Sequence, residues 1–573
     1  MAVLCSTGGA LALACVGITL YMAYRAMLPK PIPGIPYNKD AAGKLLGDIP
    51  EMMGYVMRTK RIFCWLTSLN ARHQSPIIQA FVKPGGLPWV VVTDPFESQD
   101  ILLRRIKELD RSEFFGEVIG GILPEQHIQF VSTDDRFKNN RNLINHLMAP
   151  TFIKEVSAPE LYMSVCTLIK LWKIKCGLAK GRPFSAHHDV TFAVLDSIFA
   201  SMFGLNEADT NTIQRITAVE NFEPVIPEHV NEPVSFPEGS TPDIFSAVLT
   251  LANSVTDTQL SPAPVFTSWL IRKFPYMRNA KAVKDKYIRD KVEECVQLIE
   301  DGLTTKPKSA LHSVLIRECQ VAAKEGRQPD YHKRAIADEF FGFMTAGHDT
   351  SATTIAWGLK MLTDNPNAQT RLRQELRAAF PAAVSEKRDL TYAELSSSSI
   401  PYLDAVVDEI LRHANTIAFV ARQAQQDTVI LGHHIPKGTN VFLMANGPGY
   451  LEPAIDLNDE ERSPGARQGG KSALTGAWSN DDIRLFKPER WLEKDATGVE
   501  IYNGMAGPSL AFGMGLRGCY GKRLAIQVLK IQFSLLLWHF ELLSVPDKLG
   551  GYEAVQKFAR EPTQCYIRLK EVE

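Results

Sequence analysis

The chain has 573 residues, 45% of them hydrophobic, and a formal net charge of −1, which gives no reason to expect a nucleic-acid partner. Its nine cysteines are scattered and include no C-x-x-C pair, so neither a zinc site nor a disulfide framework is indicated; they are typical of reduced thiols in a cytosol-facing protein. No Gly/Ser linker or internal repeat divides the sequence, which favours one large domain over several.

The N-terminal segment predicts a membrane anchor. Val3–Tyr24 contains no charged residue and is long enough to cross a bilayer as a helix. Arg25 and Lys30 follow it and no Lys or Arg precedes it, so the positive-inside rule places the body of the protein in the cytosol. The alternative is a cleaved secretory signal, because Ala12–Ala14 loosely resembles a cleavage site.

Residues 29–39 are rich in proline and predict a semi-rigid hinge after the anchor of residues 1–28. Beyond the hinge, residues 77–82 and 87–92 flank a Lys-Pro-Gly-Gly turn and predict a β-hairpin. An Asp-Pro pair then predicts the start of a helix over residues 94–103.

The next segments alternate between helices and irregular stretches. Residues 112–130 lack a clear period and predict a loop, whereas residues 160–220 are mostly helical by their apolar period. Residues 222–242 are proline-rich and predict a loop or lid. Between the loop of residues 112–130 and the helical residues 160–220, Phe137 and Arg141 open a helix and lie one turn apart on one face.

One long helix is predicted over residues 333–363, ending at an Asp-Asn-Pro stop. Its apolar middle carries Gly347, Asp349 and Thr350. Glycine inside a helix costs about 1 kcal/mol relative to alanine, and burying an unpaired carboxylate costs more. Such conflicts between local preference and fold are expected at functional sites.

Strands are expected at residues 428–431 and 440–444, on either side of a turn whose two histidines belong to the hairpin rather than to a metal site. Residues 457–482 are rich in charge, Ser and Gly, and predict a mobile surface insertion.

A glycine-rich stretch, residues 512–521 (FGMGLRGCYG), precedes a long apolar helical run over residues 522–543. Cys519 stands at the start of this helix, where backbone N–H groups and the helix dipole lower a thiol pKa. The glycines allow a tight turn, and Arg517 offers a fork that grips a carboxylate. A soft anionic ligand, small residues and a cation describe a haem-thiolate pocket, with Cys519 on iron and Arg517 on a propionate. A glycine-rich loop that happens to precede a core helix is the alternative.

This decapeptide resembles the haem-binding signature of the cytochrome P450 family, Phe-Gly-x-Gly-x-Arg-x-Cys-x-Gly. Further segments resemble family motifs in the family's order: Trp-x-x-x-Arg at residues 137–141, the Ala/Gly-Gly-x-Asp/Glu-Thr-Thr/Ser motif at 346–351, and Glu-x-x-Arg at 409–412 with Phe-x-Pro-x-Arg at 486–490. The resemblance implies the mostly α (α+β) cytochrome P450 fold over residues 40–573, a helical catalytic domain with small β-sheets, preceded by the N-terminal transmembrane helix.

The resemblance also implies the cofactor, haem b, with Cys519 as the thiolate ligand of iron. Cofactor-binding residues are then expected at Arg517, Arg141, Arg422, Phe512 and Gly347, with the three arginines on propionates. Phe137 departs from the family's Trp and lacks the indole N–H, which puts one propionate bond in doubt. A solvated helix charge is the alternative for Arg141.

Asp349 and Thr350 are the expected catalytic pair: Thr350 hydrogen-bonds to the activated oxygen, and Asp349 relays protons from solvent. The alternative is a back-bonded Thr and a solvated Asp. Glu409, Arg412 and Arg490 would form a buried structural network near the haem, costly to break and not catalytic.

The resemblance implies a monooxygenase that hydroxylates or otherwise oxidises an apolar small molecule, with dioxygen and with electrons from NADPH through a separate NADPH–cytochrome P450 reductase and cytochrome b5 as an optional second donor. The proline-rich lid and the insertion resemble fungal members that act on terpenoid or polyketide secondary metabolites. The expected location is the endoplasmic reticulum membrane, single-pass, with the catalytic domain in the cytosol. Phe114, Phe115 and Ile122 are candidates for substrate contact, or belong to a plain surface loop. Four apolar residues of the lid are expected to dip into lipid: Phe222, Val225, Ile226 and Phe236.

Two other functions remain open from the sequence. One is an oxygen-independent haem-thiolate isomerase or dehydratase, which NADPH-dependent oxygen uptake with substrate would exclude. The other is a non-catalytic membrane haem sensor, against which the intact pair of Asp349 and Thr350 argues.

Overall fold

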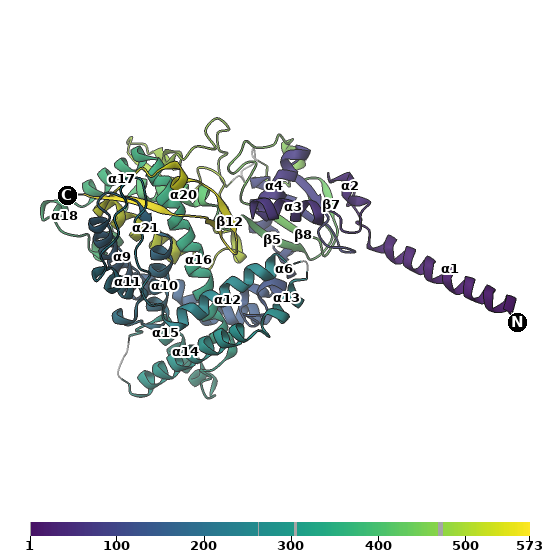
Figure 1. The fold of residues 1–573 in the computed structure, drawn as a ribbon, viewed down its shortest axis with the longest axis horizontal. Helices are drawn as coiled ribbons and strands as arrows, with labels where there is room; N and C mark the ends of the chain where they lie inside the picture. Colours follow the sequence, from purple (N-terminus) through teal and green to yellow (C-terminus); the bar gives the residue numbers. More distant parts are fainter. Residues whose placement is uncertain (1, 262, 303–305, 468–473, 573) are drawn as a thin grey trace. The chain divides into compact units, whose positions relative to one another are not determined.

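The computed structural model describes residues 2–261, 263–302, 306–467 and 474–572. The chain forms two compact units (Figure 1). The sheet unit comprises residues 1–112, 419–474 and 479–483; the helical unit comprises residues 113–418, 475–478 and 484–573.

The sheet unit is built on a five-stranded sheet of order β1-β2-β8-β5-β3. Strands β1 and β2 are antiparallel, with Ile77 opposite Val92, so the predicted hairpin is confirmed. The Asp94 side chain accepts a hydrogen bond from Glu97 N–H at the start of α5, which confirms that helix. The elements of this unit are α1 (Ala2–Met27), α2 (Lys39–Ala42), α3 (Ile49–Thr59), α4 (Ile62–His73), β1 (Ile77–Ala80), β2 (Trp89–Val92), α5 (Pro95–Arg104), β3 (Leu109–Arg111), β5 (Phe419–Ala424), β6 (Thr428–Ile430), β7 (His433–Ile435), β8 (Asn440–Met444) and the 3-10 turn η5 (Asp459–Glu461).

The strands expected around residues 428–444 pair differently from the prediction. β6 forms a hairpin with β7, because Leu431 and Gly432 adopt φ values of 47° and 75° and reverse the chain at once. The histidines of residues 433–434 therefore lie within β7. β8 instead joins the main sheet, parallel to β2 and antiparallel to β5.

The segment predicted as a mobile insertion is anchored at its beginning. Arg462 is buried and pairs with Asp94 at 2.7 Å, and Ser463 donates a hydrogen bond to Glu97 at 2.7 Å. The ion pair lies in the sheet unit and fixes this part of the insertion to α5. Residues 468–473 of the insertion lie outside the described residues.

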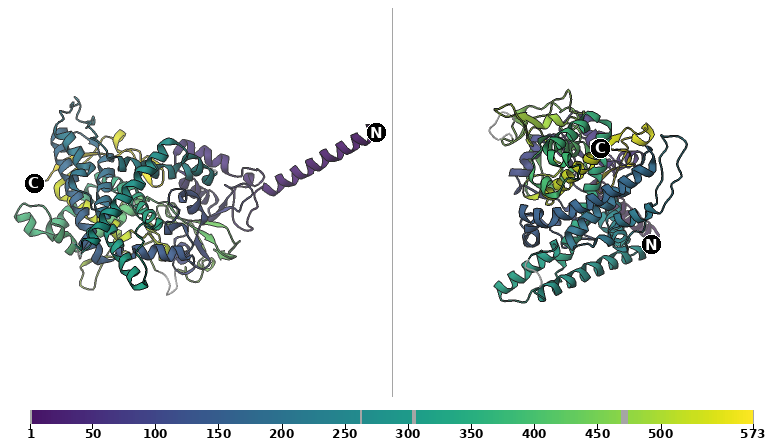
Figure 2. Two further views of the ribbon diagram at one scale, coloured as in Figure 1. Left: turned by 90° about the horizontal axis from the view of Figure 1, so that it is seen from below. Right: turned by 90° about the vertical axis from the view of Figure 1, so that its left-hand side faces the viewer.

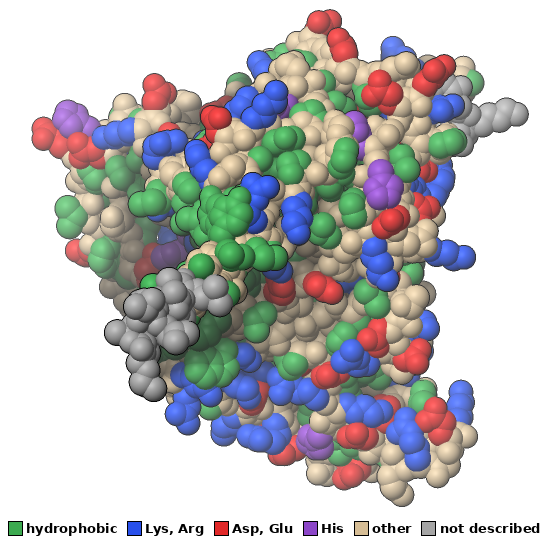
Figure 3. Space-filling view, turned by 90° about the vertical axis from the view of Figure 1, so that its right-hand side faces the viewer, with side chains coloured by type: hydrophobic (Ala, Val, Ile, Leu, Met, Phe, Trp, Pro, Cys, Tyr) green, Lys and Arg blue, Asp and Glu red, His purple; other side chains and the backbone are tan. Residues whose placement is uncertain are grey.

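Helix α1 covers the segment for which we expected a membrane anchor. Leu13, Leu20 and Met22 on it are exposed, and hydrophobic side chains gather beside basic ones on the face drawn in Figure 3. Within the described residues, however, no helix combines the length and the apolar character needed to cross a membrane. The expected transmembrane helix is thus not supported.

The helical unit surrounds the long helix α16, seen from two further sides in Figure 2. Its helices are α6 (Glu113–Ile119), α7 (Asp135–Ile144), α8 (Pro150–Phe152), α9 (Ala158–Ala179), α10 (His187–Phe203), α11 (Asn211–Glu220), α12 (Asp243–Gln259), α13 (Pro264–Ile271), α14 (Pro275–Glu300), α15 (Ala310–Glu325), α16 (Arg334–Asp364), α17 (Pro366–Ala379), α18 (Pro381–Ser385), α19 (Tyr392–Ser397), α20 (Pro401–Ala414), α21 (Lys522–His539) and α22 (Asp547–Gly550). Its strands are β4 (Phe184–Ser185), β9 (Leu492–Lys494), β10 (Glu500–Tyr502), β11 (Phe540–Leu543), β12 (Ala554–Gln556), β13 (Arg560–Pro562) and β14 (Tyr566–Glu571). Shorter 3-10 and π turns are η1 (His127–Gln129), η2 (Asn145–Met148), η3 (Ile153–Ser157), η4 (Glu207–Asp209), η6 (Pro488–Trp491) and η7 (Gly515–Arg517).

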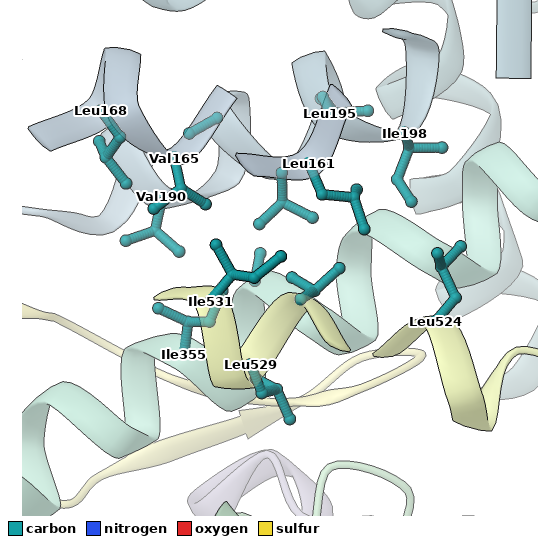
Figure 4. Packing of buried hydrophobic residues seen from close by; sticks show 14 of the residues in the cluster. Leu161, Val165, Leu168, Val190, Leu195, Ile198, Ile355, Leu524, Leu529 and Ile531 are labelled. Carbon is teal, nitrogen blue, oxygen red and sulfur yellow. The ribbon is translucent and has the colours of Figure 1, made fainter. Parts of the chain in front are cut away.

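Four helices share the core of this unit. Leu161 of α9, Leu195 of α10, Ile355 of α16 and Ile531 of α21 are each no more than 1% exposed and converge in Figure 4. Burying aliphatic side chains of this size stabilises a fold by roughly 1.5–3 kcal/mol each. This packing fixes α21, which follows the cysteine loop, against α16.

Two predicted boundaries in the helical unit need correction. The apolar run over residues 522–543 is helical only to His539; residues 540–543 form β11, which pairs antiparallel with β14. Within the predicted loop 112–130, residues 113–119 form the short helix α6. The long helix expected over residues 333–363 is confirmed as α16.

The proline-rich lid is irregular, as predicted, and its apolar residues differ in exposure. Phe236 is half-buried and its ring meets Phe184 edge-on at 5.8 Å. Val234 forms an isolated parallel β-bridge with Phe184, and its side chain is 2% exposed. Phe236 and Ile226 thus pack against the core of the unit, whereas Val225 is 88% exposed; contact of the lid with lipid stays a prediction.

Candidate active site

The loop before α21 is held by its own backbone. Gly513 and Gly515 adopt φ values of 59° and 68°, in the left-handed region that favours glycine. Cys519 N–H donates to the Phe512 carbonyl at 2.7 Å, and Gly518 N–H donates to the Gly515 carbonyl at 3.0 Å. The loop therefore reverses twice and presents Cys519 just before the first turn of α21.

Part of the Cys519 side chain is accessible to solvent, although protein groups surround the thiol closely. Burial by surrounding groups raises the pKa of the Cys519 thiol, and backbone N–H groups of Gly521 and Lys522 and the Lys522 charge oppose that rise. The helix N-terminus thus acts in the predicted direction, but the net pKa is raised, not lowered. A bound cation would add the charge that favours the thiolate.

Two guanidinium groups lie beside the cysteine loop. Arg517 is 8% exposed and donates to the carbonyls of Ile128 and Phe130 at 3.1 and 2.8 Å. Arg141 donates to the Leu516 carbonyl. Both stack on the ring of Phe137, at 4.1 Å for Arg517 and 5.6 Å for Arg141. Phe137 therefore orients both cations by cation–π contact where the family motif has Trp.

The cysteine loop is also tied to α16. The ring of Tyr520, next to Cys519, lies 5.9 Å from that of Phe343 on α16. His127 lies 5.9 Å from the same tyrosine, and its Nδ1 is 2.8 Å from Glu339 on α16. These contacts place the cysteine loop and the middle of α16 in one site.

The middle of α16 opens on this site. Ala346 is exposed although Met344, two residues earlier, is fully buried. A Cβ on Gly347 would approach Cδ1 of Ile198 to 3.1 Å, so this glycine lets α10 pack closely. The Thr350 hydroxyl donates to the Ala346 carbonyl at 2.8 Å, which is the back-bonded alternative considered from the sequence.

Asp349 lines a cavity of about 300 Å³ in the helical unit. Its walls are mostly apolar and include Phe115, Ile122 and Phe192. Two of the three expected substrate contacts thus line the cavity; Phe114 instead packs with the small apolar cluster of Val118, Ile119 and Val255.

Burial and, next, the nearby Glu561 carboxylate raise the pKa of Asp349, whereas Lys557 and the Ala559 N–H lower it; the net result is a pKa of about 7. The Glu561 carboxylate therefore favours the protonated form of Asp349. We did not expect Glu561 or Lys557 from the sequence, because a short hairpin near the C-terminus carries no motif. Only the structure brings them to α16.

The buried network predicted for Glu409 is confirmed. Glu409 is fully buried and accepts hydrogen bonds from Arg412 at 2.8 and 2.9 Å and from Arg490 Nε at 3.1 Å. The Trp491 indole and the Lys487 N–H complete its shell at 2.9 and 2.8 Å.

Arg422 lies on β5 of the sheet unit and is fully buried. Its Nη1 donates to the Ala421 carbonyl at 2.9 Å, while Nε and Nη2 have no hydrogen-bond partner among the described residues. Burial lowers the pKa of Arg422 to about 10, and Asp110 opposes this. A buried guanidinium with two open N–H edges calls for an anionic partner.

Comparison with known proteins identifies the family to which these features belong. A family model described as Cytochrome P450 matches residues 66–450 and 482–562. Cytochrome P450 monooxygenase TRI13 of Fusarium sporotrichioides is 36% identical, over 98% of this chain and 99% of its own. Cytochrome P450 monooxygenase GME11363 of Pestalotiopsis microspora is 36% identical, over 96% of each chain, and xilC of Penicillium rubens is 32% identical, over 96% and 94%.

Among solved structures, a cytochrome P450DA heme domain is similar in fold, with a TM-score of 0.66 and 16% identity over 95% of this chain and 99% of that one. This likeness supports the mostly helical fold with small sheets. The family model matches most of the sequence, and the relatives align along nearly its whole length. These two findings show that the chain belongs to the cytochrome P450 family and is a monooxygenase, an oxidoreductase.

Proposed function

We propose that the protein is a haem-thiolate monooxygenase that oxidises an apolar small molecule in fungal secondary metabolism. The observation that carries this proposal is the solvent-accessible Cys519 at the start of α21, tied through Tyr520 to the open middle of α16. When bound, a thiolate-ligated haem b activates dioxygen for insertion of one oxygen atom into the substrate.

The donor set suits that cofactor. Cys519 supplies the soft sulfur ligand, and a porphyrin's propionates need cations that donate hydrogen bonds. Arg141 and Arg517 lie beside the cysteine loop in the helical unit. A propionate role for Arg422, which lies in the sheet unit, is proposed from the family resemblance and from its open N–H edges. Phe512 packs its half-buried ring on the core below the loop. Gly347 faces Ile198 and keeps α16 close to α10. We therefore propose that space for the cofactor at this turn of α16 lies beside Ala346 and not at Gly347 itself.

Asp349 and Thr350 are the residues that handle protons. Because its pKa lies near 7, Asp349 can hold a proton at neutral pH and release it within the cavity. Thr350 can exchange its bond to the Ala346 carbonyl for one to a ligand in the site. The mostly apolar walls around Asp349 limit the access of water, which would reduce the loss of activated oxygen to side reactions.

An apolar substrate suits these walls, and terpenoid or polyketide metabolites are the classes we propose. Fungal monooxygenases are the relatives that match this chain along its length, which supports a role in secondary metabolism. We propose that electrons come from a separate NADPH-dependent reductase. The G-x-G-x-x-G pattern of residues 513–518 does not follow directly on a strand, so it lacks the context of a dinucleotide-binding turn.

A binding screen tests this function. Apolar candidate substrates are titrated into the haem-loaded protein, and binders are recognised by the low-spin to high-spin shift of the haem spectrum. Each binder is then incubated with NADPH and a reductase while oxygen uptake and product mass are followed. We expect oxygen uptake that depends on substrate, and a product heavier by one oxygen. Product formation without oxygen uptake would instead establish an isomerase or dehydratase.

A further inference from the structure

The turn of the C-terminal hairpin lies against the cavity wall of α16. Strands β12 and β13 pair with Val555 opposite Glu561. The Trp357 indole on α16 donates to the Arg560 carbonyl at 2.8 Å, and the Arg560 guanidinium stacks over Trp357 at 4.3 Å and donates to the Ala414 carbonyl at 2.8 Å. These bonds clamp the residue before Glu561 to two helices, so the position of its carboxylate is set by rigid elements.

The contacts of Arg560 with α16 and α20 place Glu561 in the lining of the cavity that Asp349 also lines. Lys557, on the turn of the same hairpin, pairs with Glu561 at 2.7 Å. The lysine side chain is 41% exposed and that of Glu561 only 14%. Charged groups therefore run in order from solvent through Lys557 and Glu561 to Asp349, inside a cavity that is otherwise mostly apolar.

We propose that Glu561 is a positioning residue for proton delivery, which holds a proton in common with Asp349 and receives its replacement through Lys557. In each cycle a proton leaves the Glu561 carboxyl and binds the Asp349 carboxylate after Asp349 has given up its own. The Lys557 ammonium then passes one N–H proton to the Glu561 carboxylate, and the Lys557 amine takes a proton from a hydronium ion of the solvent, which becomes water. No electron moves in these steps, and this role rests on the proposed function of Asp349.

Other titratable groups face this carboxylate pair and must be counted. His187 and His188, at the start of α10, line the same cavity, and His188 pairs with Glu238 at 2.9 Å. His348 precedes Asp349 on α16; it is buried, its Nδ1 contacts the Met344 carbonyl at 2.6 Å, and burial lowers its pKa. Burial also lowers the pKa of His187, so these two imidazoles stay neutral at pH 7.

Two substitutions on the hairpin are expected to shift the Asp349 titration in opposite directions. Glu561→Gln removes a negative neighbour, so the Asp349 titration moves to lower pH by about one unit. Lys557→Gln removes a positive neighbour, so it moves to higher pH. Glu553→Gln is the matched control, because Glu553 lies beside the same hairpin but its side chain is exposed and does not line the cavity.

The measurement is the infrared difference spectrum of protonated carboxyl groups in haem-loaded, substrate-free protein between pH 5 and 9, with Asp349→Asn used to assign the band. The same variants are then compared for the pH dependence of product formed per NADPH consumed. Each measurement gives a pH midpoint, one for the carboxyl band and one for product formed per NADPH. We expect both midpoints to fall in Glu561→Gln, to rise in Lys557→Gln and to stay unchanged in Glu553→Gln.

Midpoints that do not move, or that move the same way in the two test variants, would overturn the proposal. If Glu561→Gln does not fold, the upward shift in Lys557→Gln still decides it. Because the infrared measurement needs no turnover, the proposal can fail there while the monooxygenase activity stands, and the reverse outcome is equally visible.

Discussion

Two carboxylates of the helical unit, Glu409 and Asp349, differ in their surroundings and therefore in their pKa. Glu409 is enclosed by two guanidinium groups, an indole N–H and a backbone N–H. Burial alone would raise its pKa, but the hydrogen bonds from Arg412 and His413 and their charge outweigh burial and hold the pKa of Glu409 well below its usual range. Asp349 instead faces Glu561 in a cavity, and its pKa rises to about 7.

The difference separates a carboxylate that builds the fold from one that can exchange protons. A carboxylate whose lone pairs are all taken up by fixed donors keeps its charge and joins α20 to η6. A carboxylate beside a second acid can gain and lose a proton near neutral pH. Substitutions at each position should therefore act on different measured quantities.

The largest expected effect is on stability, in Glu409→Gln. The substitution leaves Arg412 and Arg490 buried without their carboxylate, and breaking such a network costs about 3–5 kcal/mol. We expect the free energy of unfolding in urea to fall by that amount. Glu386→Gln is the control, because its carboxylate is 59% exposed and pairs with Arg388 at the surface; its effect should stay below about 1 kcal/mol. Equal effects of the two substitutions would contradict the structural role of Glu409.

Asp349→Asn is expected to lower turnover strongly and stability only slightly, the opposite of Glu409→Gln. The amide cannot deliver protons, so turnover with a bound substrate should fall by about 10²-fold or more. Stability should change much less than in Glu409→Gln, since Asp349 is not held by an ion-pair network. Asp389→Asn, whose side chain is 65% exposed, should retain full turnover. A turnover in Asp349→Asn equal to that of the parent protein would remove Asp349 from the mechanism.

The smallest expected effect is on the pH dependence of stability. The pKa of Asp349 is higher in the folded state, about 7 against 3.8, so the folded state holds this proton more tightly. The stability from this group is present below about pH 4 and declines as the pH rises to about 7. Glu409 has the opposite sign, and its contribution declines as the pH falls below 4.5.

Melting temperatures between pH 4 and 8 test these signs. Asp349→Asn should flatten the decline between pH 4 and 7 and leave the acid side unchanged. A decline of the same slope in Asp349→Asn and the parent protein would show that Asp349 does not titrate there.

The parts of the fold with a strong local signal could be predicted from the sequence. The apolar period and the Asn365-Pro366 stop predicted α16 to within a residue at each end, and the Glu409 network followed from its motifs. The end of α21 could not be predicted, because the apolar residues of 540–543 suit a strand and a helix equally well, and pairing with β14 decides between them.

The site was predictable only as far as its motifs reach. Cys519, Arg141 and Arg517 come together as the motifs implied. Glu561 could not be foreseen, since its place against Asp349 depends on a tertiary clamp between Arg560 and Trp357. The raised pKa of Cys519 was missed for a related reason: the loop supplies N–H donors, as its sequence predicts, but burial, which only the fold determines, outweighs them.

The most direct test of the whole account is the reduced carbon monoxide difference spectrum of the purified full-length chain and of Cys519→Ser. A thiolate ligand gives an absorption maximum that differs from that of haem held by nitrogen or oxygen, because the sulfur donates electron density to the iron. We expect the thiolate spectrum in the parent protein and its loss in Cys519→Ser, with Cys565→Ser, a buried thiol elsewhere in the same unit, unchanged from the parent. A parent protein that takes up no haem, or a spectrum identical in Cys519→Ser, would contradict the account.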